Sequence, residues 1–206
     1  GARHLILCSR KKPNEEVHRK IEGWRQQAQV DVLAVDVSKE EEVIRLAQSY
    51  SASKIEVFHA AGVLEDGAFL NQRWERFKIP FDAKVWGAWA LHQHFGEASR
   101  FVLFSSVAAV LGTAGQANHA SANVFLDALA QHRAIRGKPA LSINWGAWSE
   151  IGEAAHRDIE ARAAAIGLGM ISPTEGIAAL ARLLKTLPIQ AAVLPLDWKM
   201  VEKYRV

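Results

Sequence analysis

The sequence predicts an α/β protein built on a parallel, doubly wound sheet. Short apolar runs typical of buried strands recur along the chain, and segments with helical periodicity separate them. Strands that are connected through helices lie parallel to one another. The 206 residues, of which 50% are hydrophobic, are enough for one domain with a sizeable core. We therefore expect a single domain that spans residues 1–206.

The predicted strands follow the apolar runs in order. They are His4–Cys8, Val30–Val37, Ile55–His59, Phe101–Ser105, Leu141–Asn144 and Ala191–Leu194. The predicted helices lie between them, at Asn14–Gln27, Lys39–Ser49, Leu70–Phe77, Phe81–Phe95, Gln116–Arg136, Ala154–Ala165 and Pro173–Leu187. Asn14 follows a proline and Ser38 precedes Glu41 in a capping-box pattern, so both are expected N-caps. Gly137 ends the longest helix.

Composition excludes several classes of function. The net charge of +3 arises from interspersed acids and bases, and Arg10-Lys11-Lys12 is too small a cluster to predict nucleic-acid binding. The single cysteine, Cys8, lies in an apolar run and is expected to be buried; it allows no disulfide within the chain and favours a reducing cytoplasm. No apolar run reaches the roughly 18 residues of a membrane span, and no signal peptide is visible. A cytoplasmic protein without nucleic-acid or membrane partners is expected.

Residues 101–130 contain the most informative pattern in the chain. A predicted strand ends at two serines, a loop with two glycines follows, and a long helix then carries His119 and Asn123. Side chains four residues apart share one face of a helix. The strand end and the helix face therefore direct Ser106, His119 and Asn123 towards a common space. Enzymes of this fold class build their sites at this carboxyl edge of the sheet.

Other strand ends carry residues suited to a dinucleotide. Arg10 follows the first strand, where an arginine can bind the 2′-phosphate of NADP; a solvated basic turn is the alternative. Asp36-Val37 follows the second strand and can accept a hydrogen bond from an adenine amino group, or can simply start a helix. His59-Ala60-Ala61-Gly62 follows the third, where small residues admit a flat ligand or form a tight turn. Lys84, on a helix, would by itself be a surface lysine.

Together these segments resemble the ketoreductase domain of modular polyketide synthases, a branch of the short-chain dehydrogenase/reductase superfamily with a Rossmann-like fold. The segments are GARHLILCSR, DVS, HAAGVLEDG, WERF, AKVWGAW, FVLFSSVAAVLGTAGQANHASANVFLDALA, NWGAW and VLPLDW, which run from the first residue to nearly the last. The resemblance implies NADPH as hydride donor. It also implies a β-ketoacyl chain, tethered to an acyl carrier protein, as substrate, and other synthase domains as partners.

The resemblance further implies a role for each site residue. Lys84 would orient the nicotinamide ribose and tune the acid, Ser106 would hydrogen-bond the substrate carbonyl, and Asn123 would hold a proton-relay water. The implied cofactor contacts are Arg10 with the 2′-phosphate, Asp36 and Val37 with the adenine, His59, Ala60, Ala61 and Gly62 with the nicotinamide ribose, and Gly146 near the nicotinamide, where the family closes a lid.

One departure from the family pattern concerns the general acid. The family places a tyrosine at position 119 to protonate the alkoxide, whereas this chain has His119 and its tyrosines, Tyr50 and Tyr204, lie outside the motif. Repulsion from Lys84 would favour a neutral imidazole, and the ring is shorter than a phenol. Loss of a positioned general acid costs about 10²–10⁴-fold in rate. We expect reductase activity to be absent or strongly impaired. There are two alternatives. The histidine could substitute imperfectly for the tyrosine, or the domain could be purely structural or dock the carrier protein.

A second departure lies at the amino end. In the family, a first strand and a glycine-rich turn precede GARHLILCSR, and that turn binds the pyrophosphate through backbone amides. No G-x-G-x-x-G motif occurs in residues 1–206. By the family's sheet order, the absent strand would lie between His4–Cys8 and Ile55–His59. We expect an amino-terminally incomplete domain that binds NADPH only with this turn present.

Further expectations concern stereochemistry and the remaining motifs. Leu64-Glu65-Asp66 resembles the Leu-Asp-Asp motif of the D-type (B-type) ketoreductase lineage. Leu111 occupies the position where the opposite class has a tryptophan. His92 and His94 lack a third ligand nearby, so no metal site is expected. The tryptophans are expected in the core or lining the site. Residues 150–169 occupy the place of the family's substrate lid, with an ordinary connecting helix as the alternative.

Overall fold

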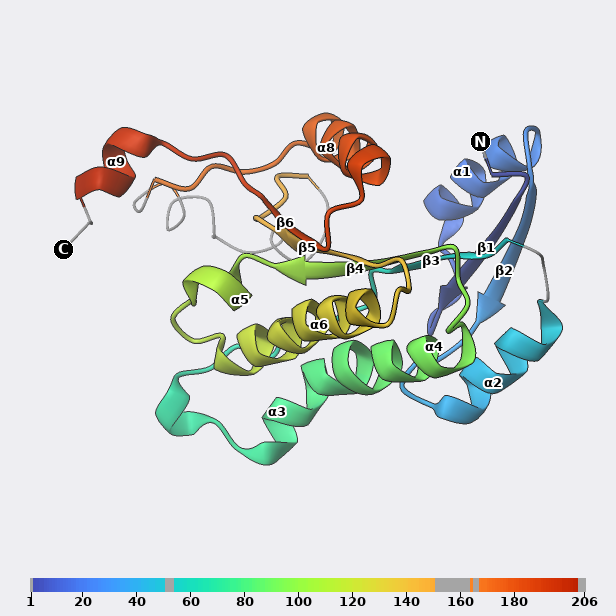
Figure 1. The fold of residues 1–206 in the computed structure, drawn as a ribbon, viewed down its shortest axis with the longest axis horizontal. Helices are drawn as coiled ribbons and strands as arrows, with labels where there is room; N and C mark the ends of the chain where they lie inside the picture. Colours follow the sequence, from blue (N-terminus) through green and yellow to red (C-terminus); the bar gives the residue numbers. More distant parts are fainter. Residues whose placement is uncertain (1, 51–53, 151–163, 165–166, 204–206) are drawn as a thin grey trace.

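The computed structural model describes residues 2–50, 54–150, 164 and 167–203. It confirms the predicted fold class, with parallel strands flanked by helices (Figure 1). Helices α1 (Glu15–Arg25) and α8 (Pro173–Thr186) lie on one side of the strands. Helices α2 (Glu40–Ser49), α4 (Ala88–His94) and α6 (Ala117–Ile135) lie on the other. This two-sided cover is the doubly wound arrangement.

The described strands form two separate parallel sheets. Strand β1 (His4–Ser9) pairs with β2 (Gln29–Ala34). The second sheet has the order β3-β4-β5-β6, and its strands are Glu56–His59, Arg100–Ser106, Leu141–Trp145 and Gln190–Val193. Within the described residues no hydrogen-bonded ladder joins β1 to β3. The resemblance predicts a further strand at this interruption, and that strand stays a prediction.

The remaining described helices are short. They are η1 (Phe69–Asn71), α3 (Trp74–Phe81), the π-helix η2 (Asp82–Gly87), α5 (Ala108–Leu111) and α9 (Trp198–Lys203). The sequence did not predict α5 or α9. The expected helix Ala154–Ala165 and the possible lid at residues 150–169 fall largely outside the described residues. No described helix is long and apolar enough to cross a membrane.

One of the two predicted N-caps is confirmed. Asn14 Oδ1 accepts a hydrogen bond from the Val17 amide at 2.9 Å. The prediction for Ser38 was wrong, because its hydroxyl donates to Asp36 Oδ1 at 2.7 Å and α2 begins only at Glu40. Glu42, rather than the expected Glu41, reaches back to the Asp36 amide at 2.7 Å. A carboxylate two residues upstream outcompetes the helix amides for the serine.

The chain from Trp74 to His94 is one continuous helical segment, whereas the sequence predicted a break near Pro80. Proline lacks the N–H that a helix interior needs. The chain stays helical past Pro80 and then takes one turn of i→i+5 hydrogen bonding at Asp82–Gly87. Such π-turns are frequent at functional sites, and this one carries Lys84.

The core has two layers, one on each face of the second sheet. Phe101 and Leu103 on β4 pack with α2, α4 and α6, and their neighbour Val102 faces the opposite layer with β5 and α8. Alternation along a strand sends successive side chains to opposite faces. Strand β4 is thus buried on both faces, and its apolar run ends at the two serines at its carboxyl end.

Cys8 is exposed, which contradicts the expectation that it is buried. It shares one face of β1 with His4 and Ile6, which are also exposed, while Leu5 and Leu7 on the other face are half-buried. Strand β1 is an edge strand with a single partner in the described residues, so an apolar run there does not guarantee burial.

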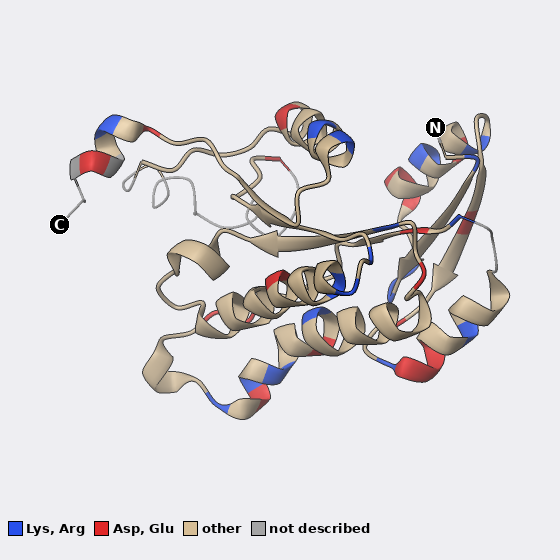
Figure 2. Cartoon of the chain, in the orientation of Figure 1, with Lys and Arg blue, Asp and Glu red and all other residues tan. Residues whose placement is uncertain are grey.

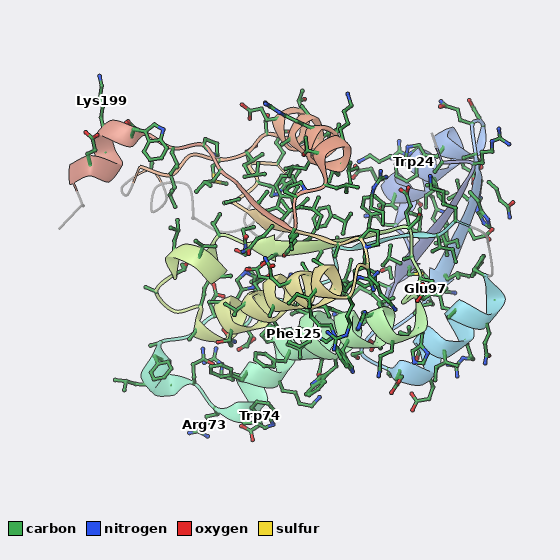
Figure 3. The ribbon with its side chains drawn as sticks, in the orientation of Figure 1. Trp24, Arg73, Trp74, Glu97, Phe125 and Lys199 are labelled. Carbon is green, nitrogen blue, oxygen red and sulfur yellow. The ribbon has the colours of Figure 1, made fainter. Side chains whose placement is uncertain are left out.

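Some tryptophans also lie outside the core. Trp24 and Trp74 are 45% and 60% exposed and stand on the outer surfaces of α1 and α3 (Figure 3). Acidic and basic side chains are interspersed over the same outer helices (Figure 2).

Gly176 in α8 provides a test of the packing between α8 and the loop after β5. A Cβ at this position would overlap the ring of Trp148, which itself packs at a tilt against Trp145 with centroids 5.0 Å apart. We expect Gly176→Ala to destabilise the domain by about 1–3 kcal/mol through overpacking. Gly23→Ala in α1, where a Cβ meets nothing within 4 Å, should instead stabilise it by about 0.5–1 kcal/mol. Urea unfolding of both variants measures the difference, and equal effects would contradict this packing.

Candidate active site

Ser106 lies at the carboxyl end of β4, as predicted. The ladder with β5 continues to this residue, where Ser106 pairs with Trp145. Its hydroxyl accepts a hydrogen bond from the Ala108 amide at 3.2 Å. That contact leaves the hydroxyl proton free to be donated elsewhere. Ser106 is half-buried, so the strand end fixes the side chain while part of it stays accessible.

His119 and Asn123 lie on successive turns of α6 and contact each other. Asn123 is fully buried, and its side-chain Nδ2 donates to the His119 carbonyl at 2.8 Å and lies 3.1 Å from His119 Nε2. A side-chain NH₂ group is only a donor. Nε2 of His119 therefore accepts this hydrogen bond and carries no proton while it does so. The structure thus brings the two residues together but directs one imidazole nitrogen at Asn123.

Lys84 is a buried residue rather than a surface lysine. It is 6% exposed, and its Nζ donates to the Phe104 carbonyl at 2.8 Å, two residues before Ser106. Burial lowers the pKa of Lys84 to about 8, although the negative charge of Asp127 acts in the opposite direction. Lys84 is therefore still mostly charged at neutral pH, and a rise of about one to two pH units would neutralise most of it.

The glycine at position 62 makes room for this lysine. A Cβ on Gly62 would lie 2.9 Å from Lys84 Cε. The sequence assigned the small residues after β3 to close approach of a flat ligand. In the structure, the space beside Gly62 is occupied by the lysine stem, and a role for Ala60, Ala61 and Gly62 in cofactor binding stays a prediction.

His59 is a structural neighbour of Lys84. Its ring is buried, and Nε2 lies 3.1 Å from the Ala83 carbonyl in the π-helix. Burial, together with the charge of Lys84, lowers the pKa of His59 to about 3. The imidazole is therefore neutral, so its Nε2 donates to that carbonyl. This bond ties β3 to the turn that carries Lys84.

The residues predicted to contact the adenine end lie after β1 and β2. Arg10 is exposed. Burial raises the pKa of Asp36, but the hydrogen bonds from Ser38 and the charges of Arg10 and Lys39 outweigh it, so the pKa lies below its ordinary value. Val37 packs against the π-helix, where a Cβ on Gly87 would lie 2.8 Å from its methyl group. Asp36 is therefore an ionised acceptor held beside a cation.

Gly146 packs at the end of β5. Its amide donates to the Val193 carbonyl at 2.8 Å, and a Cβ would lie 3.0 Å from that of Leu194. The glycine is therefore required by the contact between β5 and β6. Its predicted position at the carboxyl edge is observed, and its contact with a nicotinamide stays a prediction.

Comparison with known proteins places this arrangement in a family. Residues 1–150 match the family model described as the KR domain. The chain is a member of the polyketide synthase ketoreductase family. It is 38% identical over 209 residues to polyketide synthase GfsB of Streptomyces halstedii, covering 97% of this chain and 4% of that protein. It is 42% identical over 158 residues to the spectinabilin polyketide synthase system protein NorB of Streptomyces orinoci, covering 73% of this chain and 7% of that protein.

Solved structures agree with this assignment. An A-type ketoreductase from a modular polyketide synthase superposes with a TM-score of 0.91 at 32% identity, covering 99% of this chain and 44% of that one. The first ketoreductase of the tylosin synthase superposes with a TM-score of 0.87 at 32% identity, over 99% and 46%. The chain thus spans under half of these structures and a small part of the multidomain relatives.

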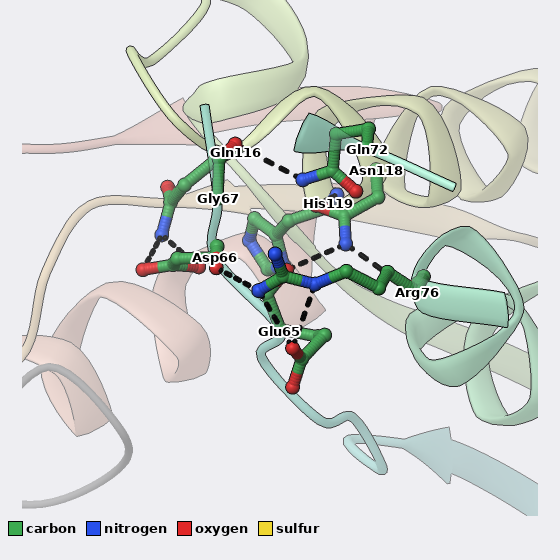
Figure 4. A network of polar contacts seen from close by, with 8 residues as sticks. All are labelled: Glu65, Asp66, Gly67, Gln72, Arg76, Gln116, Asn118 and His119. Atoms are coloured by element: carbon green, nitrogen blue, oxygen red, sulfur yellow. Dashed lines mark hydrogen bonds and ion pairs between the residues drawn. The ribbon is translucent and has the colours of Figure 1, made fainter. Parts of the chain in front are cut away.

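The loop after β3 in this ketoreductase is fixed by a polar network (Figure 4). Arg76 on α3 binds the Glu65 carboxylate at 2.7 Å and the Asp66 carbonyl at 2.6 Å. Gln116 donates to the Asp66 carboxylate at 3.1 Å, and Asn118 to the Glu65 carbonyl at 2.7 Å. The loop is thus attached both to α3 and to the first turn of α6, next to His119.

Sequence reasoning missed most of this network. It identified Glu65 and Asp66 by family resemblance but assigned nothing to Arg76, Gln116 or Asn118. An arginine in a mixed-charge helix is usually solvated, and no local pattern indicates that this one reaches a loop residue eleven positions earlier. It also missed Asp127, a buried carboxylate behind the site.

Lys84 should make the stability of the ketoreductase pH-dependent. Its folded-state pKa of about 8 lies below the ordinary value of 10.5, so between these pH values the unfolded chain holds a proton that the folded chain has lost. Stability contributed at this residue therefore rises with pH across that window, by up to about 3 kcal/mol. Urea titrations from pH 7 to 9.5 should show this rise in the native protein and not in Lys84→Met. The same slope in both would contradict a buried, titrating Lys84.

Proposed function

We propose that this ketoreductase keeps the architecture for reducing a β-ketoacyl chain on an acyl carrier protein with NADPH, but that its reduction step is strongly impaired. One observation carries the proposal. His119 stands where the family has its tyrosine acid, and its Nε2 accepts a hydrogen bond from Asn123 at 3.1 Å. Nε2 cannot donate a proton to an alkoxide while it is engaged with Asn123, so the neutral ring could donate only from Nδ1, and the ring is shorter than the phenol it replaces.

The other residues of the site fit the family chemistry. NADPH, when bound, supplies the hydride to the β-carbonyl carbon. Ser106 can donate to the carbonyl oxygen, because its own bond to the Ala108 amide uses it only as an acceptor. Asn123 Oδ1 is buried and accepts no hydrogen bond from the described residues, which suits an acceptor for a relay. The proposed defect is therefore confined to proton delivery.

The residues present fit NADPH at its adenine end. Arg10 provides exposed positive charge for a 2′-phosphate, and Asp36 is an ionised acceptor for an adenine amino group. The pyrophosphate end is different, because residues 1–206 contain no G-x-G-x-x-G motif. We infer that a preceding segment of a longer polypeptide supplies a strand between β1 and β3 together with the glycine-rich turn. Residues 1–206 would then be an amino-terminally incomplete domain.

The same His119 contact favours one alternative function. A domain in which the acid position is tied to Asn123 can persist in a synthase without turning over, as a structural element or a docking site for the carrier protein. In that case neither cofactor binding nor reduction is required of it. The two experiments below separate this alternative from an impaired reductase.

We also propose that the domain descends from the D-type (B-type) lineage. Likeness of fold does not discriminate the classes, since an A-type ketoreductase superposes closely. The proposal rests on Leu64-Glu65-Asp66, which the contacts from Arg76 and Gln116 hold next to α6, and on Leu111. Any residual product should therefore carry the D-configured hydroxyl.

Cofactor binding tests whether the domain is more than a docking element. The full-length protein should bind NADPH. Arg10→Glu should lower its affinity for NADPH at least about tenfold, because it removes a charge-assisted contact to the 2′-phosphate. NADH binding should change much less. Fluorescence titration measures both. If the native protein binds no NADPH, the structural alternative is favoured.

Restoring the acid tests the proposed defect. His119→Tyr should raise the rate of NADPH-dependent reduction of a β-ketoacyl thioester by about 10²–10⁴-fold, the usual contribution of a positioned general acid. His132→Tyr, also on α6 but remote from the acid motif, is the matched control and should leave the rate unchanged. A native rate equal to that of His119→Tyr would show that histidine is a working acid. Chiral analysis of the product tests the D-type proposal in the same assay.

A further inference from the structure

Asp127 is a buried carboxylate behind the active site that the family assignment leaves without a role. It lies on α6 roughly two turns beyond His119 and is 9% exposed. Both of its oxygens accept hydrogen bonds from β5: Oδ1 from the Ser142 hydroxyl at 2.6 Å, and Oδ2 from the Asn144 side chain at 2.8 Å. A buried carboxylate is costly unless its environment compensates it.

The Asn144 side chain extends this contact to the catalytic elements. Its Nδ2 lies 3.2 Å from the Ser106 carbonyl and 3.0 Å from the Ser105 hydroxyl. The Ser105 hydroxyl in turn donates to the Asn123 carbonyl at 3.2 Å. The hydrogen bonds that begin at Asp127 therefore end on the backbone of two site residues, Ser106 on β4 and Asn123 on α6.

The charge of Asp127 also reaches Lys84. Burial lowers the pKa of Lys84, and Asp127 is the described group whose charge opposes that shift. His59 on β3 also faces Lys84, and its pKa of about 3 leaves it neutral. From β4, the lysine meets the Phe104 carbonyl. Asp127 thus supplies negative charge near the buried ammonium group of Lys84.

We propose that Asp127 is a positioning residue of the ketoreductase site, which fixes the backbone at Ser106 and Asn123 through β5 and stabilises the charged form of Lys84. A merely structural Asp127 would hold α6 against β5 and be indifferent to Lys84. The catalytic part of this inference rests on the proposed function, whereas its electrostatic part holds whether or not the domain turns over.

Hydrogen exchange in the full-length protein tests the electrostatic part. Mass spectrometry of the slowest amides in β4 and α6 reads the equilibrium of the opening that exposes these core elements. At pH 6.5, Asp127→Asn should reduce protection about 3- to 30-fold more in the native background than in Lys84→Met, a coupling typical of interacting residues. At pH 9.0, where Lys84 is mostly neutral, this excess should fall to within about twofold. An equal cost in both backgrounds, or a coupling that ignores pH, overturns the charge role.

Turnover tests the catalytic part, in the His119→Tyr background. Asp127→Asn should lower kcat at least about tenfold with little change in KM, and should move the alkaline limb of the pH–rate profile to lower pH. Ser142→Ala is the matched control: it removes one hydrogen bond but keeps the charge, so the limb should stay in place. An unmoved limb in Asp127→Asn overturns the inference.

The remaining outcomes are also decisive. If Asp127→Asn does not fold, Asp127→Glu takes its place; it keeps the charge, so kcat should fall while the alkaline limb stays, and a displaced limb overturns the inference. If no His119→Tyr variant turns over, the proposed function fails, and the exchange experiment alone decides the role of Asp127.

Discussion

The hydrogen bond from Lys84 to the Phe104 carbonyl is the interaction on which the site depends. It joins the π-helix to β4 just before Ser106 and buries a charged group between them. The residues around Lys84 accommodate this buried charge. Gly62 lacks a side chain where the lysine stem passes, His59 holds the turn through the Ala83 carbonyl, and Asp127 offsets the charge. A buried ammonium needs such compensation.

Much of the fold followed from local pattern. The apolar runs identified all the described strands, those buried on both faces, such as β4 and β5, and also β1, which has an exposed face. The errors arose where tertiary context outweighs local preference. Cys8 lies on an edge strand with an uncovered face, Ser38 binds the Asp36 carboxylate instead of a helix amide, and Pro80 sits inside a helix that packing keeps continuous. None of these outcomes is visible in spacing alone.

The candidate site divides in the same way. His119 and Asn123 were expected to share a face because helical geometry fixes an i, i+4 pair, and they do meet. The burial of Lys84 required the fold of β3 and β4 around it. Asp127 and Asn144 were invisible to the sequence reading, since a carboxylate in a helix and an asparagine in a strand usually face solvent. Only the packing of α6 on β5 makes them partners.

These contacts also explain how a histidine can occupy the acid position without disturbing the fold. The side chain at position 119 hydrogen-bonds the Asn123 side chain on its own helix, while α6 is attached to the sheet through the backbone carbonyl of Asn123, the Asp127 side chain and the apolar residues facing β4. The loop beside it is held by contacts from Asn118 and Gln116. Stability and proton delivery therefore depend on different side chains of one helix, so the chemistry at position 119 can change while the architecture around it is retained.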